Sequence, residues 1–126
     1  MTKKTILVIE DDLELQTFVE EFLTENNYQI LLANNGNEGL AMIEENQLDL
    51  ILTDLLMPEK DGVRVISDVK ANHPEIPIIA MSGGQSVFSP VFLEAANTLG
   101  ATRTLTKPFR NEELLQTIQD CLKTDD

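Results

Sequence analysis

The chain has 126 residues, and its 22 acidic side chains against 9 basic ones give a formal net charge of −13. This balance excludes nucleic acid as a direct partner and disfavours binding to an anionic membrane surface, because both require a basic patch. A single cysteine, Cys121, excludes an internal disulfide and suits a reducing, cytoplasmic compartment. The length predicts a single domain over residues 1–126, and no apolar stretch is long enough to predict a membrane-spanning helix.

Apolar runs of strand length alternate along the chain with segments of helical periodicity. The predicted strands are residues 5–9, 28–33, 48–53, 77–81 and 102–106. Apolar residues at helical spacing predict five helices around residues 15–23, 40–43, 63–69, 91–99 and 114–122. Pro90 favours the start of the fourth helix and Gly100 its end, while Asn111 is the predicted N-cap of the fifth.

Five strands that alternate with five helices predict an α/β protein of the flavodoxin-like (βα)5 type, with a doubly wound parallel sheet. In the common strand order 2-1-3-4-5, strands 1 and 3 are neighbours where the order reverses, and ligands bind outside their carboxyl ends. Glu10, Asp11 and Asp12 follow the first strand, and Asp54 follows the third. The acidic side chains therefore gather where this fold binds a ligand, although Asp12 alone is better explained by the dipole of the following helix.

Clustered carboxylates have a defined chemistry. At about 5 Å, each pair repels by about 3 kcal/mol at an effective dielectric near 20, so the cluster raises a pKa or binds a cation. Carboxylate oxygens suit Mg²⁺ or Mn²⁺. A carboxylate also attacks phosphorus to form an aspartyl-phosphate, given a metal, a cation and a hydroxyl donor. Lys107 and Ser82, at the ends of two other predicted strands, supply the cation and the hydroxyl.

The chain resembles the receiver domain of two-component response regulators. The resemblance rests on residues 6–12 (ILVIEDD), 54–58 (DLLMP) with Asp61-Gly62, 77–83 (PIIAMSG) and 100–109 (GATRTLTKPF), in order along nearly the whole chain. Each motif alone is weak, whereas the four in register are specific. The resemblance implies a phosphoacceptor protein that assists only its own phosphorylation and dephosphorylation, and that is not an enzyme acting on other substrates.

The resemblance also implies roles for individual residues. Asp54 would accept the phosphoryl group, Ser82 would contact it and Lys107 would pair with it. Mg²⁺ (or Mn²⁺) would be held by Asp11, by Asp54 and by the backbone carbonyl of Leu56, while Glu10 would act through water. The bond between Lys107 and Pro108 would be cis. The phosphoryl donor would be a sensor histidine kinase or a phosphotransfer protein, and the signal would pass to an unknown output protein.

Three positions depart from the family pattern. Thr104 stands three residues before the lysine, where the family has an aromatic switch residue, so the usual coupling to the output face is in doubt. Leu56 and Gly84 occupy the two positions that tune hydrolysis of the phosphoryl group. Neither has a polar side chain that could orient an attacking water, which predicts a long-lived phosphoryl group.

Other interpretations remain open at this point. A receiver-like interaction module that has lost switching is favoured by Thr104 and disfavoured by Asp54 and Lys107. A haloacid-dehalogenase-like phosphatase also uses an aspartyl nucleophile, but that family has a second aspartate where this chain has Leu56. A flavin-binding flavodoxin-like protein would have a loop rich in serine, threonine and glycine after the first strand, where this chain has acids.

Overall fold

The computed structural model describes residues 3–55, 62–83, 94, 97–98 and 100–122. Its strands are β1 (Thr5–Ile9), β2 (Gln29–Ala33), β3 (Leu50–Asp54), β4 (Ile78–Gly83) and β5 (Arg103–Lys107). Its helices are α1 (Leu13–Glu25), α2 (Gly36–Glu45), α3 (Gly62–Asn72) and α5 (Asn111–Leu122). The strands form one parallel sheet in the order β2-β1-β3-β4-β5, which confirms the predicted fold. The fourth predicted helix lies largely outside the described residues.

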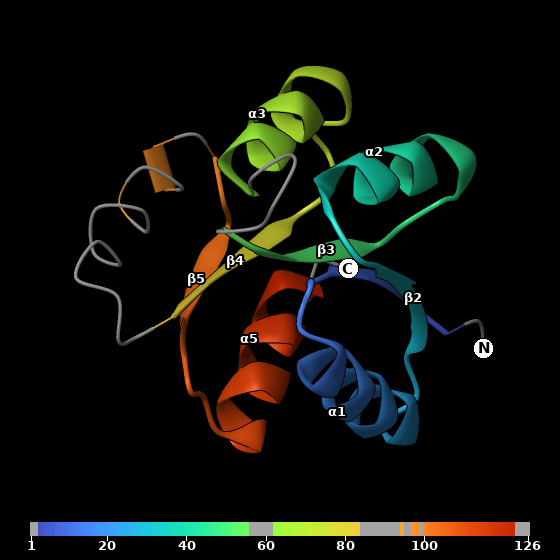
Figure 1. Ribbon diagram of the computed structural model, residues 1–126, viewed down its shortest axis with the longest axis vertical. Coiled ribbons are helices and arrows are strands. Elements are labelled where there is room, and N and C mark those ends of the chain that lie inside the picture. Colours follow the sequence, from blue (N-terminus) through green and yellow to red (C-terminus); the bar gives the residue numbers. More distant parts are fainter. Residues whose placement is uncertain (1–2, 56–61, 84–93, 95–96, 99, 123–126) are drawn as a thin grey trace.

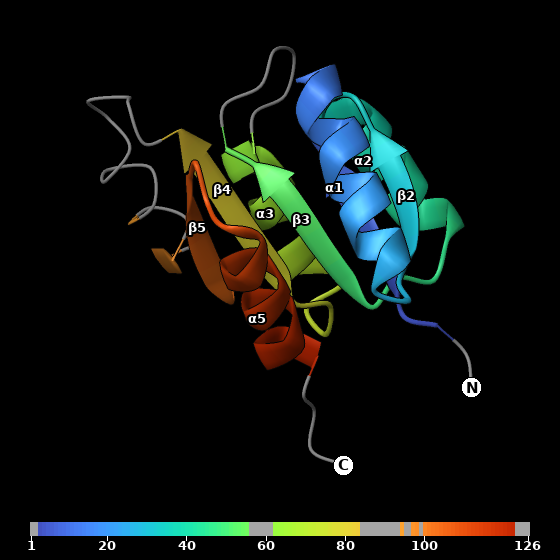
Figure 2. The ribbon, with the colours of Figure 1, turned by 90° about the horizontal axis from the view of Figure 1, so that it is seen from below.

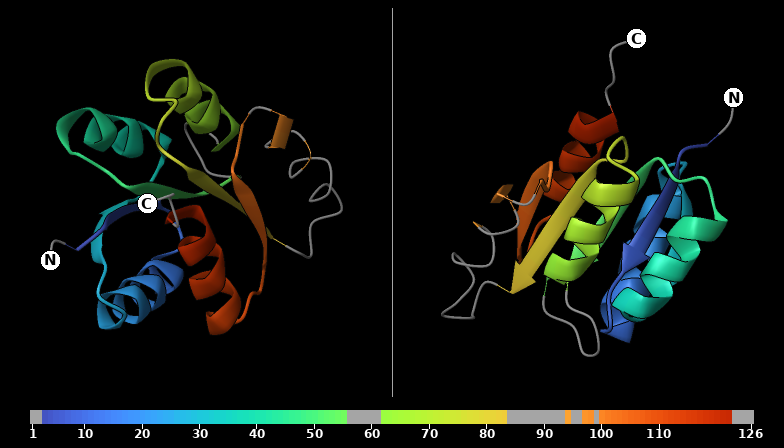
Figure 3. Two further views of the ribbon diagram at one scale, coloured as in Figure 1. Left: turned by 180° about the vertical axis from the view of Figure 1, so that it is seen from behind. Right: turned by 90° about the horizontal axis from the view of Figure 1, so that it is seen from above.

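Helices cover both faces of the sheet, with α1 and α5 on one face and α2 and α3 on the other (Figures 1 and 3). The alternation of β1 shows why two cores form, because Ile6 and Val8 pack in the core beneath α1 and α5 while Leu7 and Ile9 pack in the core beneath α2 and α3. The central strand β3 is buried along its whole length. Its apolar run therefore carries Asp54 to the carboxyl edge of the sheet as a nearly buried acid.

Helix α1 shows how the sequence positions the start of the site. Asp12 is its N-cap, and the Asp12 carboxylate accepts hydrogen bonds from the backbone N–H groups of Glu14 (3.0 Å) and Leu15 (3.3 Å). The preference of Asp12 for a helix N-terminus is thereby confirmed. Because Asp12 directly follows Glu10 and Asp11, this cap fixes the path of the chain between the end of β1 and the start of α1.

Two local predictions were wrong. Helix α5 begins at Asn111 itself, and the N–H of Leu114 donates to the carbonyl of Arg110, so Asn111 lies inside the first turn rather than before it. Glu112 and Glu113 in that turn compensate the positive end of the helix without a side-chain cap. Phe18 shares helical spacing with four other apolar residues, which predicts that it lies on the buried face of α1, yet it is 40% exposed. The other four lie in or against the core: Leu15, Val19, Phe22 and Leu23.

The periodicity of the sequence predicts more fully buried residues in α1 than the structure has, because a sheet covers only a narrow stripe of a helix. The buried stripe consists of Gln16, Val19 and Leu23, at positions i, i+3 and i+7. Phe18 lies beside this stripe and stacks on Phe22, with ring centroids 6.1 Å apart. No helix within the described ranges is both long and apolar enough to cross a membrane.

Candidate functional site

The parallel pairing of β1 with β3 brings three acids to one point at the carboxyl edge of the sheet. Figure 2 shows the parallel arrangement, in which the arrowheads of β2, β3 and β4 point towards the same edge. Ile9 is the register partner of Thr53, so the residues that follow, Glu10 and Asp54, emerge side by side. One carboxylate oxygen from each of Glu10, Asp11 and Asp54 lies within 4.8 Å of the others. Glu10 is 1% exposed and Asp54 is 7% exposed, whereas Asp11 faces solvent. The predicted convergence of acids is confirmed.

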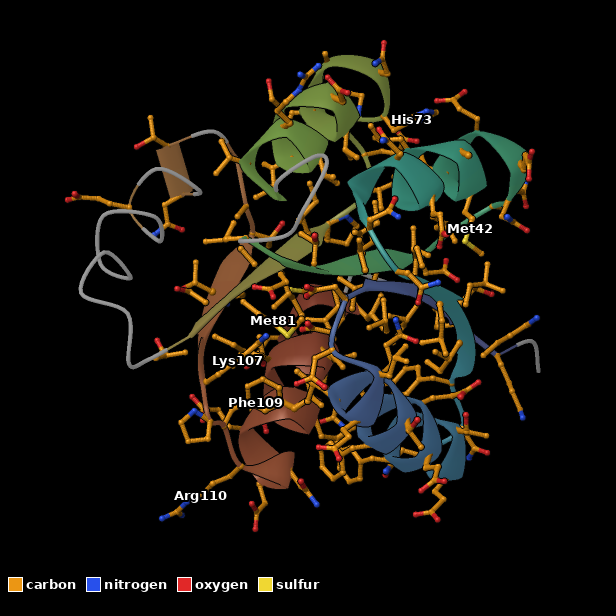
Figure 4. All side chains as sticks on the ribbon, in the orientation of Figure 1. Met42, His73, Met81, Lys107, Phe109 and Arg110 are labelled. Atoms are coloured by element: carbon orange, nitrogen blue, oxygen red, sulfur yellow. The ribbon has the colours of Figure 1, made fainter. Side chains whose placement is uncertain are left out.

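Lys107 reaches the cluster from the carboxyl end of β5, the outermost strand beyond β4. Its Nζ lies 2.7 Å from Glu10 Oε1 and 3.2 Å from Asp54 Oδ2, so one ammonium group bridges two acids. In Figure 4 the Lys107 side chain points from β5 towards the middle of the molecule. The bond between Lys107 and Pro108 is cis, in agreement with the resemblance. The lysine predicted to meet a phosphoryl group thus contacts the proposed acceptor directly.

Burial and neighbouring charges shift the pKa values of two members of the cluster, Glu10 and Lys107. Burial of the carboxyl group, together with the nearby Asp54 charge, raises the pKa of Glu10 to about 7, although hydrogen bonds from Lys107 and from the N–H of Asp12 act in the opposite direction. Burial lowers the pKa of Lys107, but its hydrogen bond to Glu10 and the charges of Asp54 and Glu10 outweigh burial, so the Lys107 pKa is raised. The lysine therefore stays charged at neutral pH.

Ser82 reaches the same edge on the strand next to β3. Asp54 is the register partner of Met81, and the N–H of Leu55 donates to the Met81 carbonyl (2.9 Å), so Ser82 lies one residue beyond the last pairing of β3 with β4. Its side chain is fully buried within β4, which extends two residues further than predicted. Leu56 and Gly84, the other positions of interest, lie outside the described residues.

Gly62 packs closely against the end of β3, a contact that the sequence motif did not predict. Its N–H donates to the carbonyl of Leu55 (2.9 Å), which seats the start of α3 against the end of β3. A Cβ at position 62 would lie 2.0 Å from the Asp54 carbonyl oxygen and 2.7 Å from Leu55 Cα. Only glycine permits this approach of two backbones.

Gln16 was also missed by sequence reasoning. Its side chain is buried, and its Nε2 donates to the backbone carbonyl of Glu10 and to Asn34 Oδ1 (2.8 Å). The sequence signal for Gln16 is its spacing, because an amide side chain stands three residues before Val19 and seven before Leu23, on the same face of the helix. A polar residue on the buried face of an amphipathic helix needs hydrogen-bond partners in the core.

The donor set of the cluster fits a divalent metal ion. Glu10, Asp11 and Asp54 offer only carboxylate oxygens, and Asp11 is exposed, which leaves room for water ligands. Mg²⁺ prefers hard oxygen ligands and usually combines one or two carboxylates with water or phosphate oxygens. The arrangement therefore suits Mg²⁺ or Mn²⁺, and no zinc-type nitrogen or sulfur ligand belongs to the cluster among the described residues.

Comparison with known proteins decides the family. Residues 6–119 match the model of the response regulator receiver domain. The chain belongs to the response regulator receiver family. This receiver is 36% identical over 117 residues to the transcriptional regulatory protein ZraR of Escherichia coli (strain K12). The aligned region covers 93% of the chain and 26% of ZraR. It is 31% identical over 118 residues to the transcriptional regulatory protein CpxR of Klebsiella pneumoniae, covering 94% of the chain and 49% of CpxR.

Solved structures agree with this assignment. A CheY-like receiver domain protein from Methanospirillum hungatei superimposes with a TM-score of 0.88 at 27% identity, covering 97% of this receiver and 95% of that chain. Chemotaxis protein CheY4 of Vibrio cholerae gives a TM-score of 0.86 at 28% identity, covering 96% and 100%. The predicted class, a phosphoacceptor signalling domain of a two-component system, is thereby confirmed. This receiver spans about a quarter of ZraR and about half of CpxR.

Proposed function

We propose that Asp54 is the phosphoacceptor of this receiver. A carboxylate oxygen of Asp54 attacks the phosphorus of a phosphohistidine on a histidine kinase or phosphotransfer protein. The phosphorus–nitrogen bond breaks, the imidazole nitrogen keeps the electron pair, and the phosphoryl group ends on Asp54 as an acyl phosphate. The observation that carries this proposal is the position of Asp54, which lies 3.2 Å from Lys107 Nζ and inside the cluster with Glu10 and Asp11.

We further propose that Asp11, Asp54 and the Leu56 backbone carbonyl hold Mg²⁺ (or Mn²⁺), with Glu10 acting through water. The contacts of Glu10 support this division of roles. Its Oε1 accepts from Lys107 and its Oε2 accepts from the N–H of Asp12 (3.0 Å), so both oxygens already have partners. Asp11 is exposed and free to bind directly. When bound, the ion supplies positive charge against the phosphoryl oxygens during transfer.

Lys107 and Ser82 complete the proposed machinery. Lys107 holds the Asp54 carboxylate in the resting protein, and a shift of its ammonium group onto a phosphoryl oxygen follows once the acceptor is modified. Ser82 donates its hydroxyl to another phosphoryl oxygen. The receiver thus stabilises its own phosphorylated state and assists its own dephosphorylation, and it processes no other substrate.

The face of α1 next to the cluster supports docking of the phosphoryl donor. Leu13 is 66% exposed and Phe18 is 40% exposed, and both line a shallow groove with Glu14, Thr17 and Glu21. Apolar side chains grouped on a surface mark a contact site for another protein. A donor seated on this face brings its phosphohistidine to the carboxyl ends of β1 and β3.

Output requires a second partner, either a separate protein or a further domain of the same polypeptide. Thr104 lies half-buried in β5 beside Ala80, without the aromatic ring that the family uses for switching. This feature favours, as a second candidate, an interaction module that does not switch. In either case we place the protein in the cytoplasm, in keeping with its single cysteine.

The test is phosphorylation with acetyl phosphate and Mg²⁺, followed by intact-mass spectrometry. The unaltered chain gains the mass of one phosphoryl group, and Asp54→Asn does not. Asp49→Asn is the matched control, because Asp49 precedes the same strand at the opposite edge of the sheet, where it accepts a hydrogen bond from the N–H of Thr5. Equal labelling of Asp54→Asn would refute the assignment, and no labelling of any variant would favour the interaction module.

A further inference from the structure

Gln16 is an unusual residue for its place in the fold. Of the three buried residues of α1, Val19 and Leu23 are apolar, and Gln16, which is 6% exposed, is the polar one. An apolar side chain would pack against the sheet here without requiring any hydrogen bond. Burial of an amide is unfavourable unless its polar atoms find partners, so the contacts of Gln16 indicate why it occupies this position.

The Gln16 amide group ties together three segments. Its Nε2 donates one hydrogen to the backbone carbonyl of Glu10 and the other to Asn34 Oδ1. The N–H of Glu10 in turn donates to the Ala33 carbonyl (3.0 Å) at the end of β2. The peptide units on both sides of Glu10 are therefore fixed, one by β2 and the other by the Gln16 side chain.

The fixed carbonyl matters because it belongs to the peptide that leads into Asp11. A peptide unit is planar, so holding the Glu10 carbonyl oxygen also holds the plane that contains the Asp11 N–H and reaches the Asp11 Cα. Within the described part of the chain, the Asp11 carboxylate has no hydrogen-bond partner of its own. Its position in the acidic cluster therefore depends on the backbone that carries it.

We infer that Gln16 is a positioning residue for the metal site. It touches neither the proposed ion nor the phosphoryl group, and it acts by orienting the peptide between Glu10 and Asp11 so that Asp11 faces Asp54. The inference rests on the proposed function, because Asp11 is a metal ligand only under that proposal. When a group that does not touch the metal but holds one of its ligands in place is removed, the metal affinity commonly falls by about 10- to 100-fold.

The experiment is a Mg²⁺ titration of the unphosphorylated chain, followed by the backbone amide signals around Asp11 in NMR spectra. Gln16→Met keeps the length and the buried packing of the side chain but removes both N–H donors. We expect its Mg²⁺ dissociation constant to rise about tenfold. Val19→Ala is the matched control, because it weakens packing on the same buried stripe and leaves the Glu10 carbonyl bond intact. We expect its Mg²⁺ affinity to stay within about twofold of the parent value, since no ligand loses its support.

Gln16→Asn provides a second variant, since its shorter side chain keeps an amide but withdraws it from the Glu10 carbonyl. All titrations are made where circular dichroism shows each variant to be folded. Parent-like Mg²⁺ affinity in both Gln16 variants, with Asp54 still phosphorylated, overturns the inference alone and leaves the proposed function standing. Equal weakening by Val19→Ala also overturns it, because stability would then explain the loss. A parent chain that neither binds Mg²⁺ nor accepts a phosphoryl group overturns both.

Discussion

Replacing Gly62 with alanine tests whether the close contact between two backbones holds Asp54 in its position. The added Cβ would lie 2.0 Å from the Asp54 carbonyl oxygen and 2.7 Å from Leu55 Cα. Carbon and oxygen atoms that are not bonded normally stay about 3.3 Å or more apart. The start of α3 and the end of β3 must therefore separate by roughly 1 Å, because neither neighbour is a flexible side chain.

The magnitude follows from two opposing terms. Forcing an extra methyl group into a packed site usually costs about 1–3 kcal/mol, and backbone neighbours place this site at the upper end. Alanine favours a helix over glycine by up to about 1 kcal/mol. We therefore expect Gly62→Ala to lower the free energy of unfolding by about 2 kcal/mol. A displacement of about 1 Å at a reacting group slows chemistry by up to about 100-fold, so labelling by acetyl phosphate should slow as well.

Urea denaturation measures the first effect and intact-mass time courses measure the second. Gly83→Ala is the control for stability, because no heavy atom lies within 4 Å of a Cβ at position 83. That variant should remain within about 0.5 kcal/mol of the parent. If Gly62→Ala were as stable as Gly83→Ala and as readily phosphorylated as the parent, the argument from backbone contact would be wrong.

Three further predictions concern the charged cluster and its surroundings. In EDTA, Glu10 binds its proton more tightly in the folded state, with a pKa of about 7 against an ordinary value of 4.5, so the free energy of unfolding falls as the pH rises from about 4.5 to about 7. Glu10→Gln should flatten that slope in urea denaturation, and an unchanged slope would contradict the assignment. Lys107→Met leaves Glu10 and Asp54 facing each other without a cation, so it should lower stability by roughly 1–3 kcal/mol at pH 8 and by less at pH 5, where a carboxyl group is protonated; an equal loss at both pH values counts against the bridge. Leu13→Ser, at a side chain that is 66% exposed, should change stability by less than about 0.5 kcal/mol and leave labelling by acetyl phosphate intact, but slow transfer from a phosphotransfer protein; equal rates from both donors speak against docking on α1.

The fold could be predicted from the sequence because periodicity and burial agree along most of the chain. The apolar run that becomes β3 is buried on both faces, as the middle strand of a parallel sheet must be. The acids at strand ends then followed from topology, since the carboxyl ends of β1 and β3 meet at one edge. Glu10, Asp11 and Asp54 came together for that reason, and Lys107 reaches them from the carboxyl end of β5 through its long side chain.

What could not be predicted depends on tertiary contacts that periodicity does not encode. Phe18 belongs to an apolar pattern in the sequence, yet it is 40% exposed. Gln16 interrupts that pattern, and its purpose becomes visible only when the Glu10 carbonyl and Asn34 lie opposite it. Gly62 appears in the sequence only as part of a motif. The need for glycine becomes visible in the structure, where its backbone lies against the carbonyl of Asp54, 8 residues earlier in the chain.

The ion pair between Lys107 and Glu10 joins residues 97 positions apart in the chain. Glu10 follows β1 at the start of this domain, and Lys107 is synthesised only with β5, the last strand of the sheet. Contacts of such long sequence separation are slow to form, because closing the intervening loop costs entropy before the contact compensates it. We therefore expect a nascent or truncated polypeptide that lacks β5 to be silent towards phosphoryl donors, so that competence to receive a signal itself reports that this domain has been synthesised through β5 and folded.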